Sequence, residues 1–128
     1  MVLIVGGAFQ GKRKYASKKL RIDYSDMIDG AEYDIGYIRN IKCVYNFQET
    51  VKKFINRSVD PIEAVNKILS ENPDVVIIMN EVGNGIVPID RKERKWREAV
   101  GKTGCFLAEN AESVYRVVCG CAILIKGE

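Results

Sequence analysis

Residues 1–13, MVLIVGGAFQGKR, contain the pattern that decides the fold of this chain. Val2–Val5 is a short continuous apolar run, rich in β-branched residues, that ends at Gly6 and Gly7. Such a run predicts a buried parallel strand, because both faces of the strand must be apolar. A helix is expected to follow from Lys12 to about Leu20. A strand, a glycine turn and a helix in this order indicate an α/β protein.

The rest of the chain supports the same class. Residues 74–80, DVVIIMN, are predicted to form the strongest strand of the chain. Their apolar run is continuous, so both faces of the strand are apolar, as a central parallel strand requires. Asp60 and Asp90 are predicted helix caps, the first followed by Pro61. Helices are expected at 47–56, 61–71, 90–100 and 105–112. Gly101 and Gly104 are expected to end the third of these helices before the fourth begins. A loop is expected at Gly83, Gly85 and Pro88. Closing strands are expected at 114–119 and 122–126, whereas 23–46 shows no clear periodicity.

The loop itself matches the pattern G-x-x-x-x-G-K. Its residues are Gly6, Gly7, Ala8, Phe9, Gln10, Gly11 and Lys12. Glycines let successive backbone N–H groups turn inward toward phosphate oxygens, and the following helix N-terminus adds its positive dipole. Lys12 would reach the β- and γ-phosphates. The alternative is a glycine-rich turn without a ligand, but the strand before it and the helix after it favour phosphate binding.

Arg13 departs from this pattern. The motif places Ser or Thr after the lysine, because that hydroxyl ligates Mg²⁺, and a guanidinium cannot bind a cation. Three alternatives remain open: Mg²⁺ is held by other groups, Arg13 neutralises phosphate directly, or turnover has been lost.

Glu81 is the expected second element of the site. An acid at the end of an apolar strand can hold Mg²⁺ through water or orient the attacking hydroxyl. We therefore predict a catalytic or metal-binding role for Glu81, against the alternative that it only ends the strand.

Composition limits the other function classes. The 128 residues are 47% hydrophobic and 29% charged, with a net charge of +3, and they are expected to form one domain over 1–128. This charge is too small to argue for nucleic acid. The apolar start is too short for a signal peptide or a membrane span, so we expect a cytoplasmic protein. The four cysteines are expected to be small buried hydrophobic residues, and the C-x-C at Cys119 and Cys121 does not have the spacing of a zinc site.

A resemblance to a known family extends these expectations. Residues 80–88, NEVGNGIVP, closely resemble the segment N-E-V-G-x-G-I-V-P of the adenosylcobinamide kinase/adenosylcobinamide-phosphate guanylyltransferases. Residues 6–12 resemble the same family's G-G-A-x-x-G-K. The resemblance covers 1–20 and roughly 72–126, and the middle of the chain is shorter and matches poorly.

The resemblance implies a three-layer, RecA-like P-loop fold with a mainly parallel sheet and a homotrimeric assembly. It implies ATP or GTP as the phosphoryl donor to a hydroxyl of adenosylcobinamide, and a second reaction that transfers GMP through a guanylylated histidine. This chain contains no histidine, so the second reaction has no nucleophile by the family's route. Gln48 lies in the region where that histidine is expected.

Two functions follow. The first is a kinase in which Lys12 and the loop amides stabilise the transferring phosphoryl, Glu81 serves the metal or hydroxyl, and an arginine at 91, 94 or 97 steadies charge. The second is a degenerate relative that binds a nucleotide or corrinoid without chemistry. A folded scaffold with no ligand is the remaining alternative.

Overall fold

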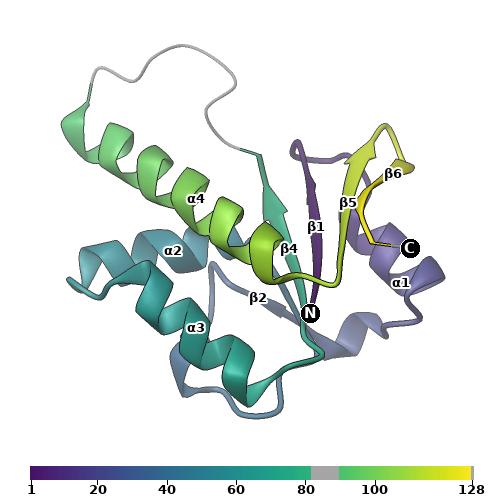
Figure 1. Ribbon diagram of the computed structural model, residues 1–128, viewed down its shortest axis with the longest axis horizontal. Helices are drawn as coiled ribbons and strands as arrows, with labels where there is room; N and C mark the ends of the chain where they lie inside the picture. Colours follow the sequence, from purple (N-terminus) through teal and green to yellow (C-terminus); the bar gives the residue numbers. More distant parts are fainter. Residues whose placement is uncertain (82–89, 128) are drawn as a thin grey trace.

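The computed structural model describes residues 1–81 and 90–127, and these form a six-stranded sheet with helices on both faces (Figure 1). The strand order is β2-β3-β4-β1-β5-β6, in which all neighbours are parallel except the antiparallel pair β5 and β6. The strands are β1 (Val2–Gly6), β2 (Met27–Asp29), β3 (Cys43–Tyr45), β4 (Val76–Asn80), β5 (Ser113–Val118) and β6 (Cys121–Lys126). The predicted three-layer α/β architecture with a mainly parallel sheet is confirmed.

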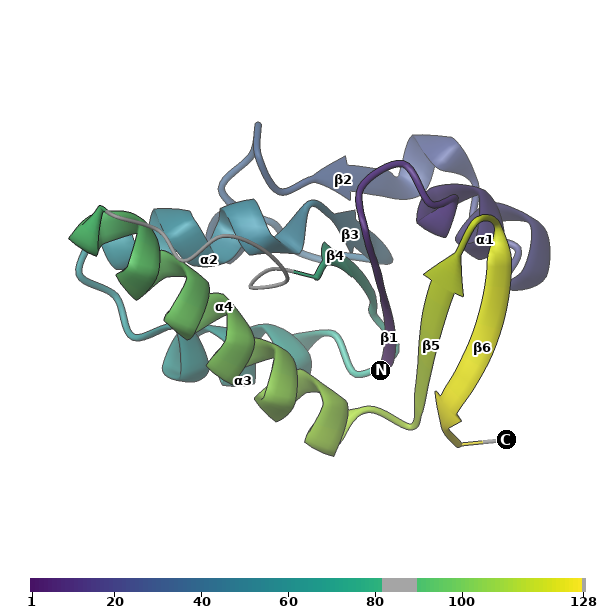
Figure 2. The ribbon, with the colours of Figure 1, turned by 90° about the horizontal axis from the view of Figure 1, so that it is seen from above.

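The helices divide between the two faces. α1 (Lys12–Lys19) covers one face, and α2 (Phe47–Asn56), α3 (Pro61–Glu71) and α4 (Arg91–Asn110) cover the other, as two perpendicular views show (Figures 1 and 2). Successive residues of each central strand serve opposite faces. Leu3 and its neighbour Ile77 pack in the larger apolar cluster with α2, α3 and α4, whereas Ile4 and Ile78 pack in the cluster with α1. The continuous apolar runs in the sequence therefore reflect burial on both sides.

The strand register places the glycine-rich loop at the carboxyl ends of the central strands. β1 pairs with β4 from Val2 opposite Val76 to Gly6 opposite Asn80. β4 lies between β1 and β3, and β5 lies on the other side of β1. The loop after β1 therefore meets the ends of β3 and β4, where parallel sheets usually bind their ligands.

The helix starts agree with the sequence. The side chain of Asp60 accepts a hydrogen bond from the Ile62 N–H (3.0 Å), with Pro61 at the first helical position. The side chain of Asp90 accepts one from the Lys92 N–H (2.9 Å). The helices predicted at 47–56 and 61–71 are confirmed, and so are the two closing strands. The loop predicted at Gly83, Gly85 and Pro88 lies outside the described residues.

Residues 23–46 contain two strands that the sequence did not predict. β2 and β3 are three residues long, too short to show a period, and two single-turn 3₁₀ helices (Tyr24–Asp26 and Ile35–Tyr37) lie among them. These strands pair with each other, and β3 pairs with β4. Their position is set by this pairing rather than by local propensity.

The prediction that Gly101 and Gly104 break the last helix was wrong. α4 is a single helix of 20 residues, and both glycines lie inside it. A Cβ placed on Gly104 would lie 3.9 Å from the sulfur and methyl carbon of Met79, so this glycine faces the sheet. Val100, Thr103 and Leu107 are buried on the same helix, and this continuous contact outweighs the low helix propensity of glycine.

The expectation of four buried cysteines was also wrong. Only Cys43 is buried, while Cys105, Cys119 and Cys121 are exposed, and all four are free thiols. Burial raises the pKa of the Cys43 thiol to about 12, so this thiol remains protonated and unreactive at neutral pH.

β6 has an unusual surface for an apolar strand. Every residue from Cys121 to Lys126 is exposed, including Ile123, Leu124 and Ile125 at 51%, 44% and 59% of their surface. None of the described helices has the length and apolar character needed to cross a membrane. The expectation of one domain over 1–128 stays a prediction.

The continuity of α4 predicts that Gly101→Ala stabilises the protein. A Cβ at this position meets no atom within 4 Å, and alanine in a helix interior is favoured over glycine by roughly 0.5–1 kcal/mol. We expect a higher midpoint of urea unfolding.

The matched control is Gly6→Ala, whose Cβ would lie 2.5 Å from the carbonyl oxygen of Val117 and should destabilise the protein. A lower midpoint for Gly101→Ala would contradict a continuous helix.

Candidate functional site

The glycine-rich loop, Gly6–Lys12, joins the buried strand β1 directly to α1. Gly11, the residue before the helix, has φ +93°, and Phe9 has φ +60°. Residues with positive and negative φ therefore alternate along this part of the loop, which turns backbone N–H groups toward the inside of a curve. No side chain caps the helix, and its first turn contains no acid. The first-turn N–H groups are therefore without a side-chain acceptor, which is the arrangement that binds anions.

Lys12 lies in this loop with its side chain largely enclosed. Only 7% of the residue is exposed, and its ammonium donates a 2.5 Å hydrogen bond to the Gly7 carbonyl. Burial lowers the pKa of Lys12, and the negative charge of Glu81 partly opposes this. Among residues 1–81 and 90–127 no carboxylate lies within ion-pair distance of this ammonium. A buried cation held only by a carbonyl gains from an incoming anion.

A pocket of about 600 Å³ opens beside the loop. It is lined by Ala8, Phe9, Gln10, Gly11, Lys12, Arg13, Lys14, Tyr24, Tyr45, Asn46, Ile78 and Asn80. Arg13 forms part of its wall, because its guanidinium lies over the Tyr45 ring at 4.0 Å and near the Tyr24 ring at 5.6 Å. Arg13 is thus held by cation–π contacts. Phe9 is fully exposed at the loop tip.

A chain of polar side chains connects the ends of three strands. Asn46, just after β3, donates from Nδ2 to Asp29 Oδ1 at the end of β2 (3.0 Å). Gln48 accepts from the Asn80 N–H at the end of β4 (2.9 Å) and donates to Asn46 Oδ1 (3.4 Å). These hydrogen bonds hold Asn46 and the Asn80 backbone in place, and both residues line the pocket. Asp29 does not line the pocket itself and reaches it only through its hydrogen bond with Asn46.

Gln48 is not positioned as a surface nucleophile would be. It is 5% exposed, its side chain joins two strand ends, and its carbonyl accepts a hydrogen bond from Trp96 Nε1 (3.1 Å). The ammonium of Lys52 lies 5.0 Å from the Trp96 ring centre. Gln48 therefore ties α2 and α4 to the sheet.

Glu81 lies next to the loop through its backbone, while its side chain is engaged elsewhere. Its N–H donates to the Gly6 carbonyl (2.9 Å). Its carboxylate accepts two hydrogen bonds from Arg116 of β5, from Nε at 2.8 Å and Nη2 at 3.2 Å. Both residues line a different pocket, of about 460 Å³, between the sheet and α4. Within the described ranges no three His, Cys, Asp or Glu side chains gather as a metal cluster.

The structure brings the loop residues together and adds partners that the sequence did not indicate. Tyr24, Tyr45 and Asn46 line the pocket and come from the segment without periodicity, as does Asp29, which bonds to Asn46. Arg116, the partner of Glu81, comes from a strand predicted only as closing. The one signal available was Asn46, a polar residue directly before a predicted helix. The arginines proposed on α4 remain candidates, with Arg97 paired to Glu93 at 3.3 Å.

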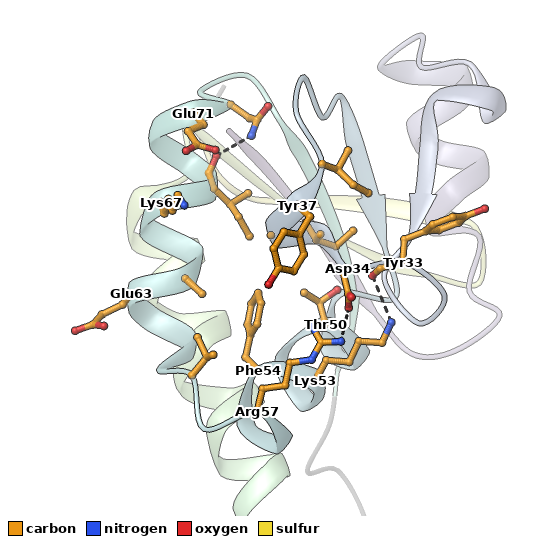
Figure 3. A pocket seen from close by; sticks show the side chains of 17 residues that line it. Tyr33, Asp34, Tyr37, Thr50, Lys53, Phe54, Arg57, Glu63, Lys67 and Glu71 are labelled. Atoms are coloured by element: carbon orange, nitrogen blue, oxygen red, sulfur yellow. Dashed lines mark hydrogen bonds and ion pairs between the residues drawn. The ribbon is translucent and has the colours of Figure 1, made fainter.

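A third pocket, of about 380 Å³, lies between residues 33–38, α2 and α3 (Figure 3). Its wall contains an ion pair between Arg57 Nη2 and Asp34 Oδ1 (2.7 Å), and Lys53 donates to the Tyr33 carbonyl (3.3 Å). None of the predicted site residues lines it. These side chains already have partners, so the glycine-rich loop remains the better candidate site.

The order of strand, glycine-rich loop and helix, with a buried lysine at the helix start, defines a P-loop type of α/β protein. Residues 40–125 match the family model described as cobinamide kinase / cobinamide phosphate guanyltransferase. The chain therefore belongs to this family.

Two curated relatives show the same similarity. The bifunctional adenosylcobalamin biosynthesis proteins CobU of Salmonella typhimurium (strain LT2) and Escherichia coli (strain K12) are each 44% identical to this chain over 52 residues. The aligned part is 41% of this chain and 29% of each relative. The chain thus matches less than a third of the length of these relatives.

The polar chain predicts that Gln48→Leu destabilises the protein. Leucine has a similar size but leaves the Asn80 N–H without its acceptor, and an unpaired buried donor costs about 1–3 kcal/mol. Chemical unfolding should show this loss, whereas Asn66→Leu, an exposed position on α3, should change stability by less than about 0.5 kcal/mol. Equal stability of the two variants would contradict a structural role for Gln48.

Proposed function

We propose that the glycine-rich loop binds the phosphates of a nucleoside triphosphate. The observation that carries this proposal is the enclosed Lys12 ammonium, which has only the Gly7 carbonyl as its hydrogen-bond acceptor among the described residues. A phosphate would supply the missing negative charge. It would also accept hydrogen bonds from the uncapped N-terminus of α1.

The reaction we propose is transfer of the γ-phosphoryl group of ATP or GTP to a side-chain hydroxyl of a corrinoid, in keeping with the family to which the chain belongs. The hydroxyl oxygen would form the new bond to phosphorus while the bond to the β-phosphate oxygen breaks. Lys12 and the loop amides would stabilise the charge on the transferring group.

Mg²⁺ is part of this proposal, although Arg13 replaces the usual hydroxyl ligand. Mg²⁺ commonly retains several waters and binds through substrate phosphates and one or two carboxylates. Glu81 could serve through water if its ion pair with Arg116 opens. The family's second reaction is not proposed, because this chain has no histidine to carry a guanylyl group.

A binding module without catalysis is the second candidate. Two observations favour it: Arg13 is held against Tyr45, where it places positive charge beside any metal, and Glu81 is already paired with Arg116. Binding of a nucleotide or corrinoid would remain, and phosphoryl transfer would be absent.

Assembly and location complete the proposal. We propose a homo-oligomer, a trimer by family resemblance, and the exposed apolar side chains of Ile123, Leu124 and Ile125 on β6 are consistent with a covered face. A cytoplasmic location accords with four free thiols. No nucleic-acid partner or membrane association is proposed.

Lys12→Ala should weaken nucleotide binding. Hydrogen bonds to charged groups contribute about 1.5–3 kcal/mol, which corresponds to a loss of roughly 10- to 100-fold in affinity. Titration calorimetry with ATP and GTP, with and without Mg²⁺, measures this change.

Lys18→Ala is the matched control, since it removes the same charge from an exposed position of α1. Its affinity should remain within about twofold of the parent, allowing for a weak long-range electrostatic contribution. No binding at millimolar nucleotide, or equal affinities for Lys12→Ala and Lys18→Ala, would overturn the proposal.

Arg13→Ser should increase the dependence on Mg²⁺. The substitution supplies the hydroxyl that ligates the metal in this motif and removes a neighbouring positive charge. Arg13→Ala removes the same charge without adding a hydroxyl. The difference in Mg²⁺ dependence between the two variants therefore measures the effect of the hydroxyl ligand alone. Release of nucleoside diphosphate in the presence of cobinamide measures turnover, and its absence in the parent protein with intact binding would select the module over the kinase.

A further inference from the structure

The turn between β5 and β6 carries two exposed thiols beside the glycine-rich loop. Cys119 and Gly120 have φ +49° and +78°, which are the values of a type I′ two-residue hairpin turn. Val118 and Cys121 form the last pair of the ladder. Figures 1 and 2 both show this turn next to the segment that joins β1 to α1.

The turn is joined to the glycine-rich loop by backbone donors. The Cys119 N–H donates to Gln10 Oε1 (2.5 Å), and the Gly120 N–H donates to the Gln10 carbonyl (2.9 Å). A Cβ placed on Gly11 would lie 3.4 Å from the Gly120 Cα. The conformation of the loop therefore depends on the conformation of this turn.

The two thiols differ from the other cysteines in position. Cys43 is buried, and Cys105 is exposed on α4. Cys119 and Cys121 are both exposed and are separated only by Gly120, whose conformational freedom favours closure of a small ring. An exposed thiol is open to exchange with small disulfides.

We propose that Cys119 and Cys121 form a reversible thiol modification site that controls the glycine-rich loop. A Cys119 thiolate attacks one sulfur of a low-molecular-weight disulfide, which forms a mixed disulfide and releases one small thiol. The Cys121 thiolate then attacks the Cys119 sulfur, which forms the Cys119–Cys121 disulfide and releases the second small thiol. The two cysteines are oxidised and the small disulfide is reduced to two thiols.

Closure of this ring changes the backbone of the turn. The type I′ angles at Cys119 and Gly120 direct both N–H groups to Gln10, and a disulfide across Gly120 rotates these groups away. Loss of these hydrogen bonds loosens the loop around Lys12. The effect on nucleotide affinity rests on the proposed function, whereas the modification and the loosening of the loop do not.

The test compares the protein reduced with dithiothreitol and oxidised with the disulfide of glutathione. Intact mass and free-thiol titration report the disulfide, hydrogen exchange of the amides of residues 6–12 reports the loop, and calorimetry with GTP and Mg²⁺ reports binding. We expect oxidation to remove two thiols with no added glutathione, to speed exchange in the loop, and to lower affinity on the order of tenfold, as loss of a hydrogen bond would. Dithiothreitol should reverse all three changes.

Cys105→Ser is the matched control and should respond as the parent does, whereas Cys119→Ser and Cys121→Ser should not form the disulfide. Retention of all thiols, stable mixed disulfides alone, or a disulfide that leaves loop exchange unchanged would overturn the inference. If the reduced protein binds no GTP, the proposed function fails, while mass and hydrogen exchange still decide this inference.

Discussion

The parallel pairing of β1 with β4 on one side and β5 on the other is the constraint on which the remaining structure depends. This register brings Gly6 opposite Asn80 and Val5 opposite Arg116. The Val117 carbonyl then lies so close to Gly6 that no side chain fits there. A shift by one residue would exchange the two apolar faces of β1 and move the loop away from the ends of its neighbours.

The candidate site has cationic side chains on one side and neutral amide groups on the other. Lys12 and Arg13 supply the cations from α1, and Asn46 and Asn80 supply neutral groups at the strand ends. Gln48 lies behind them and hydrogen-bonds to both. Neutral amides in place of carboxylates leave the pocket with an excess of positive charge. Such a pocket suits an anionic ligand better than it suits a free metal ion.

The sequence predicted those parts of the fold in which local pattern and tertiary contact agree. The apolar runs of β1 and β4 and the caps at Asp60 and Asp90 are such cases. It failed where tertiary contact decides alone: β2 and β3 are too short to carry a period, and Gly101 stays helical because the residues around it pack on the sheet. The loop residues of the site were predicted from their motif. Arg116, which pairs with Glu81, and Asp29, which bonds to Asn46, were not predicted, because strand pairing brings them next to these residues.

Trp96 is the one tryptophan of the chain, and its indole N–H bonds to the Gln48 carbonyl while Lys52 lies over its ring. In spectroscopic terms, the protein contains a single indole fluorophore, built into the contact between α2 and α4, whereas its six tyrosines emit at shorter wavelength. The indole emission reports whether this helical layer stays docked on the sheet. Phe9, at the exposed tip of the glycine-rich loop, gives no tryptophan emission. A tryptophan placed there would add a second indole fluorophore at the candidate site itself.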